Sequence, residues 1–260
     1  MKISPINHQS FKAYHPVFKE DVSNERLATK YLNHTTYFFR YGDLDEFLIE
    51  KLKRQSTSKE LQVLSLGCSY GEEVYSYAMG FDSPYKAHIV GLDLSQRAID
   101  EAKDGRYKLT PYEQNRFFSE AENEEQTPFE NRTRNSFKRN FLCVNQYRSE
   151  WIKKKESFKN CEFRTENILD LENMFESNSQ DLILCRYVLY HLNLEDQDKV
   201  LEQIYKVLKP GGLLCVEPNG FYGISDFGFK QISDDFPCVV QKPKFPHKFS
   251  AKLHNLKFDI

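Results

Sequence analysis

The chain has 260 residues, of which 36 are Lys or Arg and 38 are Asp or Glu, so its formal net charge is −2. Such a balanced charge gives no general attraction to nucleic acid or to acidic membranes. The length suits one large domain with appendages, or two small domains, and is enough to bury a substantial core. No segment approaches the ~20 apolar residues that span a bilayer, and residues 1–20 hold no apolar core of a secretory signal. None of the six cysteines forms a CxxC pair, so we expect a cytoplasmic protein with reduced thiols, no membrane insertion and no metal site.

The segment 1–57 is expected to precede a main domain that spans 58–260. Residues 36–40 read Thr-Tyr-Phe-Phe-Arg, which is unusually aromatic for a loop and indicates a hydrophobic clamp over the neighbouring sheet. Asp43 is placed to cap the helix that follows. The apolar positions of that helix recur at helical spacing; they are Leu44, Phe47, Leu48 and Leu52.

The stretch Leu61–Gly80 predicts a buried strand, a tight turn from Gly67 to Gly71 and an amphipathic helix. In open α/β sheets, this first turn lies where nucleotide-like cofactors bind. Its GxxxG spacing is not the dinucleotide fingerprint, and it lacks the GK[ST] of a phosphate loop. Glu72 and Glu73 would repel a pyrophosphate and suit a cofactor with positive charge, such as S-adenosylmethionine (SAM). A packing turn followed by two solvated glutamates at a helix N-terminus is the alternative.

A second buried strand is predicted over 87–94, and Asp93 lies near its end. An acidic residue at this position often holds the ribose hydroxyls of an adenosine cofactor. Ser95 is placed to cap the next helix and Gly105 to end it, so Asp93 could also belong to the helix cap.

Residues 110–160 differ in composition and are expected to form an inserted subdomain. Within them, the segment 131–159 holds nine Lys or Arg against two Glu, interleaved with aromatic residues. This mixture could bind single-stranded nucleic acid by stacking and charge. A subdomain with a solvated basic face is the more common origin of such a pattern, so we expect no nucleic acid partner.

The alternation of strands and helices resumes after the insert. Further strands are predicted over 161–169, 181–186, 213–217 and 238–241. Asn193 is placed to cap a long helix, and Pro210-Gly211-Gly212 is expected to end it. This order of elements predicts an α/β protein with a mostly parallel sheet and helices on both faces.

The motifs resemble those of the class I SAM-dependent methyltransferases. In chain order they are LSLGCSYGEEVYSYAM, GLDLS, NILD, LILCRYVLYHL and VLKPGGLLCVE. Together with the Thr-x-Phe-Phe-Arg motif at 36–40, they resemble more narrowly the chemotaxis-receptor (CheR-type) methyltransferases over about residues 33–220. The resemblance implies a Rossmann-like fold with a seven-stranded-type sheet, SAM as cofactor and S-adenosylhomocysteine (SAH) as product.

The resemblance also implies a cofactor site. It places Glu73 at the ammonium end of SAM, Asp93 at the ribose and the Asn167 amide at the adenine. With the turn residues included, the expected cofactor-binding set is Thr36, Arg40, Gly67, Cys68, Gly71, Glu73, Asp93, Asn167, Ile168, Cys185 and Arg186.

The reaction implied by the resemblance is methyl transfer to glutamate side chains of a protein, such as the cytoplasmic region of a membrane receptor. Arg40 and Arg186 are candidates to orient the acceptor carboxylate, and His191 is placed near the methyl-transfer site. Tyr187 and His191 stand where the family carries Asn and Tyr, which leaves the acceptor open. A small-molecule or RNA acceptor, or a SAM-binding sensor without catalysis, are the alternatives.

Overall fold

The computed structural model describes residues 36–81, 84–118, 127–217 and 223–244. Every described residue belongs to the compact unit that begins after residue 33. The sequence interpretation placed a boundary after residue 57 instead. The clamp at 36–40 and the helix that follows it are therefore part of the same unit as the sheet.

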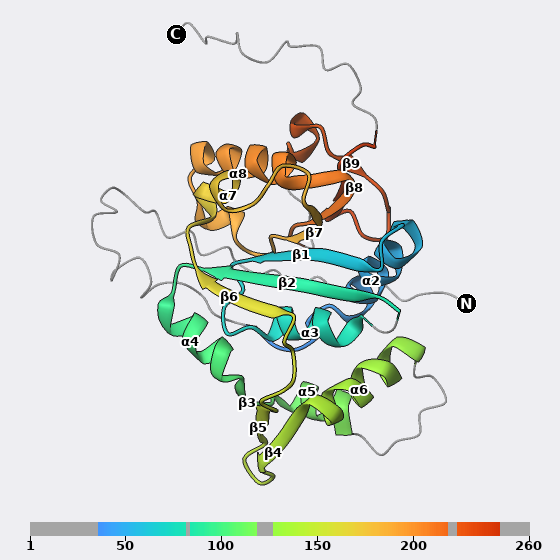
Figure 1. The fold of residues 1–260 in the computed structure, drawn as a ribbon, viewed down its shortest axis with the longest axis vertical. Coiled ribbons are helices and arrows are strands. Elements are labelled where there is room, and N and C mark those ends of the chain that lie inside the picture. Colours follow the sequence, from blue (N-terminus) through green and yellow to red (C-terminus); the bar gives the residue numbers. More distant parts are fainter. Residues whose placement is uncertain (1–35, 82–83, 119–126, 218–222, 245–260) are drawn as a thin grey trace, which may run out of the picture. The chain divides into compact units, whose positions relative to one another are not determined.

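Seven strands form the main sheet in the order β6-β2-β1-β7-β8-β10-β9 (Figure 1). The first five strands are parallel, whereas β10 is antiparallel to both β8 and β9. The strands are β1 Glu60–Leu66, β2 Lys86–Asp93, β6 Cys161–Thr165, β7 Gln180–Leu184, β8 Leu208–Cys215, β9 Lys230–Gln231 and β10 Val239–Gln241. The predicted fold class, a Rossmann-like and mostly parallel seven-stranded sheet, is confirmed.

The helices of the main domain precede, connect and follow the parallel strands and fix the position of the site. They are α2 Gly42–Gln55, α3 Glu72–Gly80, α4 Gln96–Asp104, α7 Leu171–Met174 and α8 Leu194–Val207, with short 3-10 helices η1 Ile168–Asp170, η2 Leu189–His191 and η3 Ile224–Phe227. From β1 the chain moves through α3 to β2, and from β7 it moves through α8 in the opposite direction to β8. Because such crossovers are right-handed, α3 and α8 lie on opposite faces of the sheet. The strand order reverses between β1 and β7, and ligands bind outside the carboxyl ends of the strands at such a point.

Three predicted helix ends are confirmed. The Ser95 hydroxyl accepts a hydrogen bond from the Ala98 amide, and Gly105 ends α4 in the left-handed conformation. The Asn193 side chain accepts from the Asp196 amide at the start of α8. These caps supply partners for backbone groups that the helices leave without one.

Two other predicted helix ends were wrong. Asp43 does not cap α2, because the helix already begins at Gly42 and Asp43 lies in its first turn. The Pro210-Gly211-Gly212 run does not end α8, since that helix stops at Val207 and strand β8 already includes the run. The Gly211 amide donates to the Lys242 carbonyl and the Lys242 amide donates to the Gly212 carbonyl, so the run pairs with the chain that follows β10.

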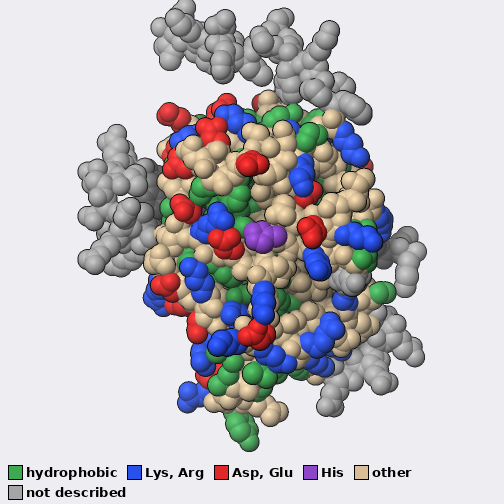
Figure 2. Space-filling view, viewed as in Figure 1, with side chains coloured by type: hydrophobic (Ala, Val, Ile, Leu, Met, Phe, Trp, Pro, Cys, Tyr) green, Lys and Arg blue, Asp and Glu red, His purple; other side chains and the backbone are tan. Residues whose placement is uncertain are grey.

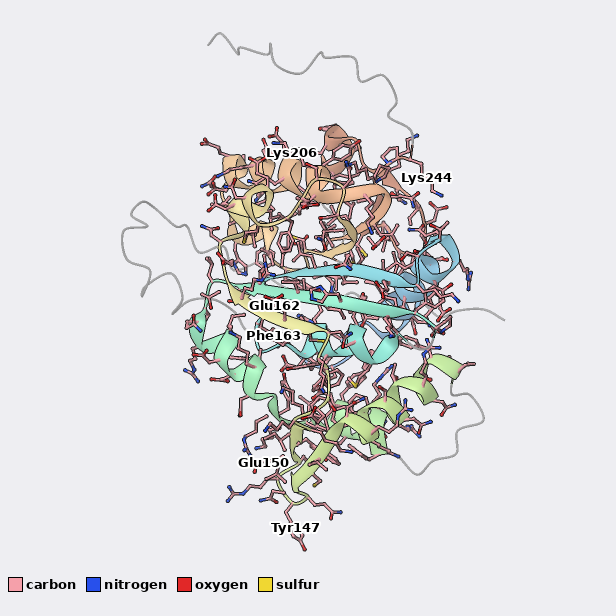
Figure 3. All side chains as sticks on the ribbon, in the orientation of Figure 1. Tyr147, Glu150, Glu162, Phe163, Lys206 and Lys244 are labelled. Atoms are coloured by element: carbon pink, nitrogen blue, oxygen red, sulfur yellow. The ribbon has the colours of Figure 1, made fainter. Side chains whose placement is uncertain are left out.

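The inserted segment folds around a second, three-stranded sheet in the order β3-β5-β4 (lower part of Figure 1). Its elements are β3 Arg106–Lys108, α5 Pro111–Phe118, α6 Pro128–Asn140, β4 Phe141–Asn145 and β5 Glu150–Lys153. Phe137 stacks on Phe117 with ring centroids 4.1 Å apart and on Phe141 at 4.4 Å. Trp151 stacks on Phe118 at 4.6 Å. These aromatic rings thus pack against one another inside the insert, whereas Tyr147 projects fully exposed from its end (Figure 3).

Lys and Arg side chains are interspersed with Asp and Glu over the face shown in Figure 2. Some basic residues of the insert have an acidic or aromatic partner within the protein. Arg132 bonds Glu50 of α2, and Lys159 pairs with Glu156. Lys138 lies over the Phe118 ring. The expectation that the insert binds no nucleic acid stays a prediction.

Candidate active site

The turn from Gly67 to Gly71, which follows β1, lies close to the residues that follow β7. Gly67 has a φ of 69°, and a β-carbon there would lie 2.6 Å from a methyl carbon of Val188. Gly71 has a φ of 89° and faces Ala102 and Phe163 in the same way. Both glycines are therefore required by backbone conformation and by space. The Cys68 amide donates to the Leu92 carbonyl, which attaches the turn to β2.

Asp93 holds this turn in place from the end of β2. One carboxylate oxygen accepts from the Ser69 amide at 2.8 Å and the other from the Ser95 amide at 2.9 Å. Ser69 itself has a φ of 50°, which is uncommon for a residue other than glycine. Asp93 thus organises the turn and the start of α4 together. Each carboxylate oxygen has a second lone pair for a ligand hydroxyl.

A buried ion-pair network, which we call the Asp45–Arg186–Glu73 triad, joins three elements at the carboxyl end of β1 and β7. Arg186 Nε donates to Glu73 at 2.6 Å and Arg186 Nη1 donates to Asp45 at 2.9 Å. The side chains of Arg186, Asp45 and Glu73 are only 6%, 1% and 15% exposed. Burial raises the pKa of Asp45, although Arg186 opposes this rise.

Two hydroxyl groups complete the triad. The Ser65 hydroxyl donates to Glu73 at 2.7 Å, and the Tyr77 hydroxyl donates to Asp45 at 2.9 Å. Glu73 is the most exposed member, so its carboxylate is the one that a ligand ammonium can approach. The guanidinium of Arg186 is directed at two protein carboxylates.

Glu72, next to Glu73, has a different environment and was missed as a site residue. It is buried, and one of its oxygens has no hydrogen-bond partner among the described residues. Burial raises its pKa to about 8, the nearby Glu113 adds to the rise, and a hydrogen bond with Thr36 opposes it. The expected cofactor residue Thr36 thus contacts Glu72 at the start of α3.

The clamp at 36–40 is held from the insert. The Phe38 amide donates to Glu113 of α5 at 2.7 Å, and the same carboxylate accepts from the Thr110 amide and hydroxyl. The Phe38 ring is fully buried and lies edge-on to Phe137 and Phe141. On the other side, the Phe39 amide donates to the Ser76 hydroxyl of α3. The clamp therefore links the insert to the helix that carries Glu73.

Arg40 lies among tyrosine rings at the edge of the site. Its guanidinium carbon is 4.4 Å from the Tyr187 ring centroid, 5.5 Å from that of Tyr41 and 5.7 Å from that of Tyr37. His191 is exposed in η2 and its ring lies 4.0 Å from that of Tyr190. Partial desolvation of the ring lowers the pKa of His191, which favours its neutral form.

The remaining predicted residues are spread along the strand ends. Asn167 is exposed at the end of β6, and its side-chain oxygen accepts from the Leu169 amide. Ile168 is buried beside it. The amide of Cys185 donates to the Cys215 carbonyl. Because Cys185 is fully buried, its thiol faces the core. Sequence reasoning missed Asp45, Tyr41 and Glu113, because only the tertiary contacts give these residues a role.

The fold and the residues at the ends of the strands define the class of protein. A glycine turn after β1, an acidic residue ending β2 and a partly accessible Glu73 suit a cationic adenosine cofactor. This is the arrangement of a class I SAM-dependent methyltransferase, and the residues present fit SAM. Within the described ranges we find no cluster of three or more potential metal ligands and no helix able to cross a membrane.

Comparison with known proteins gives the family. Residues 33–220 match the family described as CheR methyltransferase, SAM binding domain, so the chain belongs to the CheR methyltransferase family and SAM is its cofactor. It is 27% identical over 215 residues to the probable biofilm formation methyltransferase WspC of Pseudomonas aeruginosa, covering 80% of this chain and 46% of that protein. It is 27% identical over 207 residues to a chemotaxis protein methyltransferase of Campylobacter jejuni, covering 75% of this chain and 68% of that protein.

Among solved structures, the phosphoethanolamine N-methyltransferase 2 of Haemonchus contortus in complex with SAM matches with a TM-score of 0.39 and 18% identity. The match covers 71% of this chain and 29% of that protein. A likeness of this size says nothing about the methyl acceptor. The chain also spans less than half of the WspC relative, so its acceptor has to be argued from its own residues.

Proposed function

We propose that the protein transfers the methyl group of SAM to a carboxylate, and that this carboxylate is a glutamate side chain of a protein. The observation that carries the proposal is the position of Arg40, whose guanidinium carbon lies over the Tyr187 ring at the edge of the site, where a planar guanidinium suits a carboxylate partner. The names of the WspC and Campylobacter relatives agree with methyl transfer. The cytoplasmic region of a membrane receptor is one protein of this kind, and a cytoplasmic location follows from it as part of the same proposal.

The residues divide into a cofactor side and an acceptor side. On the cofactor side, Glu73 faces the ammonium group and Asp93 the ribose hydroxyls, while the exposed Asn167 is at the end of β6 for the adenine. Bound SAM supplies an electrophilic methyl group on a sulfonium. Because Arg186 is directed at Asp45 and Glu73, it positions Glu73 rather than the acceptor.

On the acceptor side, a glutamate carboxylate is already ionised near neutral pH and needs no general base. One carboxylate oxygen forms the new bond to carbon as the carbon–sulfur bond breaks, and SAH remains. The protein then contributes mainly alignment of the reacting atoms and exclusion of water. Arg40 orients the carboxylate, and the neutral His191 is not required to accept a proton.

The direct test combines binding and labelling. SAH should bind the purified protein with micromolar affinity in calorimetry, and radiolabelled SAM should give protein-bound methyl groups that base releases as methanol. Base-stable incorporation into a small molecule or RNA would support the alternative acceptors. SAH binding without any transfer would support a sensor, and no SAH binding would contradict the cofactor site itself.

A second test concerns Arg40. Replacement Arg40→Ala should slow single-turnover methyl transfer at least tenfold, which is ~1.4 kcal/mol in the barrier. SAH affinity should change much less, because the proposed partner of Arg40 is the acceptor carboxylate and not the cofactor. Arg40→Lys should restore little, since the ammonium keeps the charge but loses the two-pronged geometry. Normal transfer by Arg40→Ala would reduce Arg40 to a structural residue.

A further inference from the structure

The tyrosines around Arg40 form an ordered stack, which we call the Tyr41–Tyr187 pair. The two rings are nearly parallel, with an interplanar angle of 22° and centroids 6.3 Å apart. Their hydroxyl groups are hydrogen-bonded to each other although the residues are 146 positions apart in the chain. The guanidinium of Arg40 lies within 6 Å of both ring centroids, the range of a cation–π contact.

The pair joins the two parts of the protein that meet at the acceptor side. Tyr41 directly follows the clamp at 36–40, and Tyr187 directly follows Arg186 at the end of β7. Tyr187 has a φ of 61°, a left-handed conformation that is unusual for a bulky residue. A strained residue of this kind persists when its surroundings over-determine it, and such residues cluster at functional sites. Tyr190 lies edge-on to Tyr187 with centroids 6.3 Å apart and is itself exposed.

We propose that Tyr41 and Tyr187 are positioning residues that hold the Arg40 guanidinium flat against the Tyr187 ring, so that its edge meets the acceptor carboxylate. This inference rests on the proposed function. A stacked guanidinium uses its face for the ring, and its N–H groups lie in its own plane. The Tyr187 ring therefore fixes the plane in which those groups point, and the hydroxyl bond to Tyr41 fixes the ring.

The arrangement also affects which methyl acceptor can bind beside Arg40. A carboxylate presents two oxygens in one plane and can match the edge of a fixed guanidinium in a fork-to-fork geometry. An amine presents no such pair of acceptors, and a positively charged amine is repelled. The Tyr41–Tyr187 pair thus favours a carboxylate side chain over other nucleophiles at this edge of the site.

The test separates the ring from its hydroxyl. Tyr187→Asn removes the ring and is compatible with the backbone, since Asn tolerates a positive φ. Tyr187→Phe keeps the ring and removes only the bond to Tyr41. Tyr147→Asn is the matched control, because Tyr147 is fully exposed at the end of the insert.

Two measurements are made on each variant in complex with SAH or SAM. The first is the proton shift of the Arg40 Nε–H group by nuclear magnetic resonance, assigned with Arg40→Lys. We expect a ring-current upfield shift in the wild type and in Tyr147→Asn, a smaller shift in Tyr187→Phe because its ring has lost the bond to Tyr41, and no shift in Tyr187→Asn. The second is methyl transfer to a synthetic alanine-rich peptide that carries a Glu-Glu pair. For Tyr187→Asn, we expect kcat/KM to fall five- to tenfold with SAH affinity unchanged within twofold. Tyr187→Phe should lower kcat/KM by a smaller factor, two- to fourfold, because its ring is no longer fixed by Tyr41, and Tyr147→Asn should match the wild type.

The outcomes separate this inference from the function on which it rests. An unshifted Arg40 resonance in the wild type, or one that Tyr187→Asn leaves in place, overturns the stack whatever the acceptor. Loss of the shift with unchanged transfer overturns the role of the stack in acceptor positioning. If the wild type methylates RNA or a small amine and neither the peptide nor other protein glutamates, the proposed function fails and this inference about a carboxylate fails with it. Loss of both the shift and the transfer in Tyr187→Asn, with a smaller decrease of both in Tyr187→Phe and none in Tyr147→Asn, supports it.

Discussion

Two adjacent glutamates at the start of α3 show how far neighbouring residues of one type can differ. Glu73 is paired with Arg186 and Ser65, whereas Glu72 is buried, hydrogen-bonded to Thr36 and close to the carboxylate of Glu113. The sequence pattern GEE gives no reason to distinguish these two glutamates. Only the burial of each side chain shows that one is an ion-pair member and the other a carboxyl group whose pKa is raised to about 8.

The raised pKa of Glu72 predicts a specific pH dependence of stability. An unfolded glutamate loses its proton near pH 4.5, and Glu72 in the folded chain loses it near pH 8. Between these values the folded state binds the proton that the unfolded state has lost, so the free energy of unfolding falls as pH rises. Glu72→Gln cannot titrate and keeps a hydrogen-bonding partner for Thr36.

We therefore expect Glu72→Gln to gain stability over the wild type progressively from pH 5 to pH 8, by about 4 kcal/mol, and to keep that difference at higher pH. Urea denaturation at a series of pH values measures it. The exposed Glu166→Gln serves as the control and should show no such trend. A pH-independent difference for Glu72→Gln would contradict the buried, protonated carboxyl.

At the scale of elements, the insert is a support for the clamp as much as a separate subdomain. Glu113 of α5 accepts from the Phe38 amide, and the Phe38 ring packs on aromatic residues of α6 and β4. The composition alone predicted a subdomain with a solvated basic face and did not say where its aromatic rings lie. The structure turns most of those rings inward, because stacked and edge-on aromatic pairs stabilise a small core with few aliphatic residues.

This support predicts a local effect of Glu113. Glu113→Ala leaves the buried Phe38 amide without an acceptor, at a cost of about 1–3 kcal/mol to the clamp. Hydrogen exchange at Phe38 should accelerate at least tenfold, since local opening becomes easier. Methyl transfer should fall in parallel, while exchange in the strands β1 and β2 stays protected.

The control for this experiment is Glu130→Ala, which removes a capping-box carboxylate at the exposed start of α6. It should loosen the first turn of α6 and leave Phe38 protected. Equal exchange at Phe38 in wild type and Glu113→Ala would show that the ring packing alone holds the clamp.

At the scale of the whole molecule, the sheet and its order of elements were predictable, because buried parallel strands appear as apolar runs and their helices carry clear caps. Ser95, Gly105 and Asn193 behave as their local sequence indicates. Asp43 and the Pro210–Gly212 run do not, since tertiary contacts override local signals there. The partners of Arg186 lie 141 and 113 positions away along the chain, so no local pattern could reveal them.

Through these long-range contacts, the Asp45–Arg186–Glu73 triad connects three elements. They are helix α2, which follows the clamp, helix α3, which carries Glu73, and the tip of β7. Replacing Arg186 by Ala leaves two carboxylates buried without their cation. Breaking a buried ion pair in this way costs about 3–5 kcal/mol, because the remaining charges stay desolvated. We expect Arg186→Ala to lose this amount of unfolding free energy in urea denaturation at pH 7.

The loss should shrink as pH falls towards 5, since the orphaned carboxylates then take up protons in the folded state before they do so in the unfolded state. The matched control is Arg164→Ala, which breaks a half-exposed pair with Glu162 and should cost less than about 1 kcal/mol. Asp45→Asn in the wild-type background leaves Arg186 paired with Glu73, so its cost should be well below that of Arg186→Ala. Equal costs for Arg186→Ala and Arg164→Ala would show that the triad does not join these three elements, and Glu73 would then need another explanation for its fixed position.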